Sequence, residues 1–201
     1  FAKTGGLGDV IGALPKSLVK NGHEVAVILP YYDVVSAKFG DQVEDLGFFY
    51  TNVGWRRQYV GIKKIVRDGV TFFFIDNEQY FNRGTVYGEW DDGERFGYFQ
   101  KAVIEMLNQL NYWPNIIHCH DWHTGMIPCM VKETHDADPR YRAIRFVYTI
   151  HNMAYQGNFG PEMLDSCLGL PYYLLDNGNV RFDGGLSLIH ISEPTRLALI
   201  S

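Results

Sequence analysis

Apolar residues recur at helical spacing in three segments of the chain. The first segment, residues 9–20, is closed by Asn21-Gly22 and contains Pro15, which we expect to kink or split the helix. Further helices are expected over residues 94–110 and 124–131. Strand-like runs separate these segments, and the alternation of helices with strands is typical of an α/β fold.

Runs rich in β-branched and aromatic residues predict the strands. Buried strands are expected over residues 23–29, 115–119 and 145–150. The first helix, its Asn-Gly stop and the strand after it form half of a doubly wound unit, which predicts a Rossmann-like sheet. From residue 43 to residue 75, strand-like runs follow one another, with turns at Gly54 and Asp68-Gly69. This pattern predicts a β-hairpin or meander inserted into the alternating fold.

Polar residues gather where the predicted strands end. The strand over residues 115–119 leads into His120-Asp121-Trp122-His123, and the strand over residues 145–150 leads into His151-Asn152. A loop over residues 78–93 follows a third strand and is long enough to be functional. Because ligands of open α/β sheets lie beyond the carboxyl ends of the strands, these three ends predict a binding site.

A glycine-rich segment, Lys3-Thr4-Gly5-Gly6-Leu7-Gly8, precedes the first helix. Glycine lets the backbone approach a ligand closely, and the start of a helix offers unpaired N–H groups and the positive end of its dipole. Lys3 adds a positive charge. The segment therefore predicts a phosphate or diphosphate site, although it matches neither G-x-G-x-x-G nor a P-loop. A tight turn that serves packing alone, with Lys3 solvated, is the alternative.

Composition narrows the class of protein. The 201 residues carry a formal net charge of −5, which argues against a nucleic-acid partner. The 46% hydrophobic and 20% charged residues are typical of a soluble globular protein, and no apolar run is long enough to span a membrane. The 13 Tyr, 13 Phe and 4 Trp supply aromatic faces, which suit carbohydrate. Cys119, Cys129 and Cys167 are too few for a disulfide framework, so we expect reduced thiols in a cytosolic protein.

The histidines around residue 120 also raise the hypothesis of a metal-dependent hydrolase built on His118, His120, Asp121 and His123. On a strand, His118 and His120 share a face while Cys119 points away, which gives no ready tetrahedron. No H-E-x-x-H or C-x-x-C motif supports a metal, so we expect none. Histidines that are hydrogen-bonded in or near the core remain a further alternative.

Several motifs together resemble one family. K-T-G-G-L-G-D-V at residues 3–10, followed by I-G-A-L-P-K, resembles the opening signature of bacterial glycogen synthases and plant starch synthases. D-W-H at residues 121–123 and H-N-x-x-Y-Q-G at residues 151–157 resemble two further blocks of that family. D-D-x-x-R-F at residues 91–96 resembles its starch synthase-like members. The motifs stand in the family's order, and the resemblance runs from Lys3 to about Gly185.

The resemblance implies the GT-B fold, in which two Rossmann-like domains face each other across a cleft. It implies transfer of glucose from ADP-glucose to the non-reducing end of an α-1,4-glucan, glycogen or starch, with retention of configuration. No cofactor beyond the sugar-nucleotide donor is expected. The implied location is the cytoplasm, or a plastid if the source is a plant. A non-catalytic glucan-binding module, which would use the same aromatic residues and H-N-x-x-Y-Q-G, is the main alternative.

The resemblance also assigns residues. It implies that Lys3 and the glycine segment hold the diphosphate, that His151 contacts the transferred glucose, and that Asp121 and Trp122 line the glucosyl pocket. The expected catalytic residues are His151 and Asp121. The expected substrate-binding residues are Lys3, Gly5, Gly6, Gly8, Asp9, Tyr87, Trp122, His123, Asn152, Tyr155 and Gln156. Asp91-Asp92, by contrast, is interpreted as a helix N-terminus whose acidic residues suit the dipole.

The resemblance finally implies domain boundaries. Residues 1–185 are expected to form the N-terminal catalytic domain without its first strand, because nothing strand-like precedes the glycine segment. Residues 186–201 have no counterpart in the family and look like a translated sequencing adapter, and the C-terminal GT-B domain is expected to be absent. A missing central strand would expose two apolar edges, so we expect the isolated polypeptide to be inactive and poorly stable.

Overall fold

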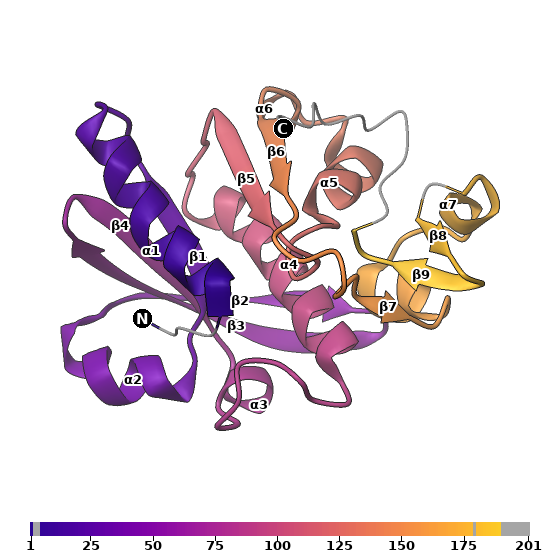
Figure 1. Cartoon of the computed structure of the whole chain (residues 1–201), viewed down its shortest axis with the longest axis horizontal. Helices are drawn as coiled ribbons and strands as arrows, with labels where there is room; N and C mark the ends of the chain where they lie inside the picture. The colour runs from indigo at the N-terminus through magenta and orange to yellow at the C-terminus, as the bar shows by residue number, and fades with distance from the viewer. Residues whose placement is uncertain (2–4, 179, 190–201) are drawn as a thin grey trace. The chain divides into compact units, whose positions relative to one another are not determined.

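The computed structural model describes residues 1, 5–178 and 180–189, which form a mixed α/β structure (Figure 1). The described chain separates into two units. The first unit holds Phe1–Thr51 and Gln58–Asp92. The second holds Asn52–Arg57 and the described residues from Gly93 onward. Most of the four-stranded sheet belongs to the first unit, and the other two sheets belong to the second.

The first unit begins with helix α1 and ends with the short helix α3. Its elements are α1 (Gly5–Lys20), β1 (Ala26–Pro30), α2 (Asp33–Phe39), the 3₁₀-helix η1 (Gly40–Gln42), β2 (Glu44–Val53), β3 (Arg56–Arg67), β4 (Val70–Asp76) and α3 (Glu78–Phe81). The sheet order is β1-β4-β3-β2, with β1 parallel to β4 and β3 antiparallel to β4. The predicted inserted β-meander is therefore confirmed, and its turns lie at Gly54 and Asp68-Gly69, all with positive φ.

Helix α1 differs from its prediction at both Gly5 and Pro15. It begins at Gly5 rather than at Asp9, so residues 5–8 form the first helical turn instead of a turn ahead of it. The first N–H groups of a helix have no intrahelical partner in any case, so glycines can occupy this turn without losing hydrogen bonds. The helix also continues through Pro15 to Lys20 and is not split. It ends as predicted, at Gly22 with φ of +86°.

The second unit carries the remaining elements around helix α4. They are α4 (Asp92–Gln109), β5 (Ile116–His120), α5 (Ile127–His135), α6 (Pro139–Arg142), β6 (Arg145–Thr149), β7 (Asn158–Phe159), the π-helix η2 (Leu164–Leu168), α7 (Tyr173–Asp176), β8 (Arg181–Phe182) and β9 (Gly185–Ser187). Strands β5 and β6 are parallel neighbours, and β7, β9 and β8 form a separate antiparallel sheet in that order (Figure 1). Strand β9 includes residues 186 and 187 of the predicted non-family tail, of which residues 190–201 lie outside the described residues.

Aromatic and aliphatic side chains of α4 fill the core of the second unit. Phe96, Tyr98, Phe99, Met106 and Leu107 are buried to within a few per cent. The buried Gln100 accepts the backbone N–H of Met126 at 2.7 Å, and so connects α4 to the segment that enters α5.

Candidate active site

Strands β5 and β6 bring two predicted motifs to one edge of their sheet. They are parallel, and the register pairs His120 with Thr149, the last residue of each strand. The chain leaves both strands at the same edge, because parallel strands have their carboxyl ends side by side. Asp121 and His151 therefore follow neighbouring strand ends although they are 30 residues apart in the sequence.

The Asp121 carboxylate binds the backbone of the neighbouring loop. Its Oδ1 atom accepts the N–H of His151 at 2.7 Å and that of Asn152 at 3.4 Å. Its own N–H donates to the carbonyl of Thr149 at 3.0 Å. Asp121 is buried and has a φ of +56°, a left-handed conformation that costs a non-glycine residue free energy. The geometry makes Asp121 a clamp between the two strand ends.

Two histidine rings meet across the same edge. Nδ1 of His120 and Nε2 of His151 are 2.9 Å apart, which is a hydrogen bond whose donor depends on the tautomer. On the side of β5, the His118 ring stacks on His120 at 4.0 Å between centroids, and Nε2 of His118 lies 2.7 Å from Oγ1 of Thr149. Burial, assisted by His118 and His151, lowers the pKa of His120 to about 3. His120 is therefore neutral near pH 7.

No metal-binding group is found around these histidines in the part of the chain that the structure describes. There, no three His, Cys, Asp or Glu side chains are arranged to hold a metal ion. Nδ1 of His120 and Nε2 of His151 bind each other. Burial also lowers the pKa of His118, with His151 as the second cause.

Trp122 and His123 lie in a packed aromatic cluster beneath the loop. The His123 ring stacks on Trp122 at 4.0 Å and meets Phe96 edge-on at 4.5 Å, and Phe96 also packs edge-on against Trp122. Burial lowers the pKa of His123 to about 4, so its ring is neutral. Gly157 has a φ of +63°, and a Cβ there would lie only 2.8 Å from Cβ of Trp122. Trp122 thus supports the H-N-x-x-Y-Q-G loop from below.

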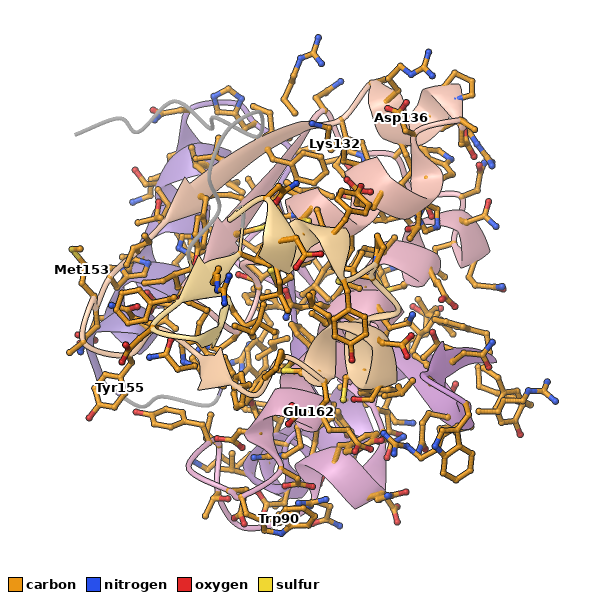
Figure 2. The ribbon with its side chains drawn as sticks, turned by 90° about the vertical axis from the view of Figure 1, so that its right-hand side faces the viewer. Trp90, Lys132, Asp136, Met153, Tyr155 and Glu162 are labelled. Carbon is orange, nitrogen blue, oxygen red and sulfur yellow. The ribbon has the colours of Figure 1, made fainter. Side chains whose placement is uncertain are left out.

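The loop over residues 151–157 is exposed in its middle, and its end is hydrogen-bonded to a neighbouring segment. Asn152 accepts the N–H of Ala154 at 2.9 Å, which is a local turn bond. Met153 is 73% exposed and Tyr155 is 67% exposed, and both side chains project outward in Figure 2. The carbonyl of Gln156 accepts the N–H of Leu188 at 3.1 Å. Asn152 and Tyr155 are therefore available to solvent, whereas Gln156 is half-buried.

The remaining predicted residues belong to the first unit. Gly5, Gly6 and Gly8 lie in the first turn of α1, and Asp9, which follows them, is exposed. Lys3 lies outside the described residues. The exposed Tyr87 lies in the loop between α3 and α4, which Arg83 closes through an ion pair of 2.7 Å with Asp91.

Asp91 and Asp92 act locally, in agreement with their interpretation as a helix start. Asp91 binds Arg83, as described, and Oδ2 of Asp92 accepts the N–H of Gly88 at 2.6 Å. Asp92 is the first residue of α4, where negative charge suits the helix dipole. Both carboxylates are occupied by structural bonds.

Sequence reasoning did not predict that the side chains of His120, Thr124 and Thr149 make hydrogen bonds within the site. Oγ1 of Thr124 accepts the N–H of His120 at 2.7 Å and lies 2.9 Å from the His120 carbonyl, which fixes the backbone there. The signals were present as H-x-H on one strand and a threonine two residues before His151 on the next. Only the strand register shows that these residues meet.

Comparison with known proteins places this chain in a family. The model of the starch synthase catalytic domain matches residues 1–192. The chain is 63% identical over 182 residues to a glycogen synthase of Streptococcus equi subsp. zooepidemicus, covering 90% of this chain and 38% of that protein. It is 58% identical over 187 residues to a glycogen synthase of Streptococcus uberis, covering 93% of this chain and 39% of that protein. The chain thus spans about two fifths of the length of these curated relatives.

A solved structure agrees with these relatives. The catalytic domain of starch synthase IV from Arabidopsis thaliana, bound to ADP and acarbose, superposes with a TM-score of 0.84 at 31% identity. The match covers 94% of this chain and 41% of the plant chain. It confirms the predicted fold class, a Rossmann-like α/β fold from the N-terminal half of a GT-B glycosyltransferase. In the described residues, no helix has the length and apolarity needed to cross a bilayer. Sequence motifs, strand topology and both comparisons agree, and the chain belongs to the starch synthase catalytic domain family.

Proposed function

We propose that the protein carrying this chain is a glycogen or starch synthase. It transfers glucose from ADP-glucose to the non-reducing end of an α-1,4-glucan, with retention of configuration. The observation that supports this most is the clamp of Asp121 on the backbone of His151 and Asn152, because it presents the H-N block at the ligand edge of a parallel strand pair. The catalytic domain of the Arabidopsis relative is bound to ADP and acarbose, which supports a sugar-nucleotide donor and a glucan acceptor here.

Each predicted residue has a chemical role in this proposal. His151 lies against the glucosyl unit, whose transition state resembles an oxocarbenium ion. Asn152, Tyr155 and Gln156 offer donors and acceptors for sugar hydroxyls. The first turn of α1, with Gly5, Gly6, Gly8 and Asp9, contributes unpaired N–H groups toward the diphosphate, and Lys3 adds a positive charge. Tyr87 is assigned to the wall of the active cleft.

The packed residues have supporting roles. Trp122 stacks on His123 and packs against Gly157 of the loop. In this proposal, Trp122 affects the glucosyl pocket indirectly, by supporting the loop that lines it. No metal is required, because helix N–H groups and Lys3 stabilise the leaving diphosphate. The free, buried thiols of Cys119, Cys129 and Cys167 support a reducing, cytoplasmic setting.

The test is a transfer assay on the full-length protein that carries this chain. We would measure incorporation of labelled glucose from ADP-glucose into glycogen for wild type, His151→Ala and Lys3→Ala. Met153→Ala is the matched control, because Met153 is in the same loop and is largely exposed. We expect losses of about a hundredfold or more in both site variants and near wild-type activity in the control.

Other outcomes would point to other functions. Glycogen binding without transfer in a folded wild-type protein would favour the glucan-binding module. Activity that depends on an added divalent metal and cleaves the glucan would favour the hydrolase. Fully active site variants would preserve the synthase assignment and remove the assigned roles.

A further inference from the structure

His120 is placed to control the ring of His151. The two rings are nearly parallel, with planes 18° apart and centroids 5.2 Å apart, and the bond between Nδ1 of His120 and Nε2 of His151 is 2.9 Å long. A bond between two ring nitrogens needs one proton between them, so each ring dictates the state of the nitrogen that it faces. The Nε2 atom of His151 is therefore occupied within the protein.

His120 is itself held by contacts with Thr124 and His118. Thr124 binds both its backbone N–H and its carbonyl, the His118 ring stacks on its face, and Thr149 holds His118. Burial keeps the His120 ring neutral at working pH. A neutral ring that its neighbours fix in place can hold one partner in one orientation.

These contacts assign His120 a function beyond packing. We propose that His120 is a positioning residue for the transfer reaction: it occupies Nε2 of His151 and fixes the ring so that its Nδ1 edge is the one offered to the glucosyl unit. This inference rests on the proposed function. His120 does not itself touch the substrate in this proposal.

The test separates positioning from packing with two substitutions in the full-length protein. His120→Phe keeps a flat ring of similar size but removes the nitrogen, whereas His120→Asn keeps a hydrogen-bonding atom close to the position of Nδ1. We expect kcat for transfer from ADP-glucose to fall about thirtyfold in His120→Phe, with KM for ADP-glucose changed less than about threefold. We expect His120→Asn to recover most of kcat. A purely packing role predicts the reverse order, because asparagine fills the space less well than phenylalanine.

His23→Phe provides the matched control. It makes the same substitution at an exposed histidine and leaves the bond between His120 and His151 in place. We expect its kcat to stay within about threefold of wild type.

The outcomes also distinguish this inference from the function on which it rests. Unchanged kcat in His120→Phe beside an inactive His151→Ala would overturn the positioning role and leave the synthase. A wild-type protein without transfer would remove the proposed function itself. Should His120→Phe fail to fold, ¹⁵N-histidine NMR of the wild-type protein decides: coupling between Nδ1 of His120 and Nε2 of His151 across the bond supports the inference, and its absence overturns it.

Discussion

The carboxylate of Asp121 accepts the backbone N–H of His151 at 2.7 Å, so a side chain at the end of β5 holds the main chain at the end of β6. The bond is partly buried and its acceptor is a carboxylate oxygen, a kind of acceptor that makes stronger bonds than a neutral one. Because the same carboxylate also reaches Asn152, it fixes the direction in which the loop leaves the sheet.

Replacing Asp121 should therefore lower the free energy of unfolding. The loss should depend on whether the new side chain keeps a hydrogen-bond acceptor and tolerates the left-handed backbone. Asp121→Ala loses the acceptor and leaves a φ of +56° that alanine tolerates poorly, and we expect a loss of about 2–3 kcal/mol in the free energy of unfolding. Asp121→Asn retains an acceptor and suits the left-handed region, so its loss should be less than half as large. Urea denaturation measures both, and equal losses would contradict the clamp.

Gly157→Ala should displace the loop over residues 151–157 from Trp122. The added Cβ would lie 2.8 Å from Cβ of Trp122, at a residue with a φ of +63°. We expect a loss of about 2–3 kcal/mol and a clear drop in transfer activity. Gly184→Ala is the control, because Gly184 has a φ of +79° but open space around it. It should show the backbone strain alone, about 1 kcal/mol. Similar losses in both variants would mean that the contact with Trp122 is unimportant.

Acid should destabilise the second unit through two buried histidines. The folded pKa values are about 3 for His120 and about 4 for His123, against about 6.5 in an unfolded chain. Between those values the unfolded state binds more protons, so stability falls as the pH drops below about 6.5. By pH 4.5, each histidine should cost about 2.5 kcal/mol.

The measurement is the urea midpoint as a function of pH. His123→Leu should show a shallower fall between pH 7 and pH 4.5 than wild type, because one of the two histidines no longer titrates. His23→Gln, a change at an exposed histidine, should leave the slope unchanged. If the urea midpoint of His123→Leu depended on pH as steeply as that of wild type, the titration of His123 would not contribute to the acid destabilisation.

Arg83→Ala should loosen the loop that carries Tyr87. The ion pair between Arg83 and Asp91 is 2.7 Å long and mostly buried on the aspartate side, and Nε of Arg83 also donates to the carbonyl of Gln79. We expect faster amide hydrogen exchange over residues 82–91 and a stability loss of about 1 kcal/mol. Lys16→Ala removes the exposed pair with Asp68 and should change neither quantity measurably.

Much of the fold could be predicted because hydrophobic periodicity reports burial directly. The long helix α4, the strands β5 and β6 and the inserted meander all have strong patterns and clear turn residues. The first turn of α1 was mispredicted because glycine signals a turn by propensity, whereas the helix tolerates glycine where its N–H groups have no partner. Helix α2 and strands β7 to β9 are too short to leave a periodic signal.

The candidate site could be predicted only in part. The motifs locate His151 and Asp121 at strand ends, but the roles of these residues stay predictions. What the sequence could not provide is the pairing of His120 with His151, because that bond depends on the register of β5 and β6. The burial of Trp122 and His123 against Phe96 is a long-range effect of the same kind.

The left-handed backbone of Asp121 has a consequence for how this family can vary. Position 121 needs a conformation that few side chains tolerate, and it needs a short acceptor that reaches the next strand end. Glycine tolerates the conformation but has no acceptor, and glutamate has an acceptor on a longer side chain, so asparagine is the replacement that best combines both demands. A protein with asparagine at position 121 would therefore keep the shape of the site while replacing its carboxylate with an amide.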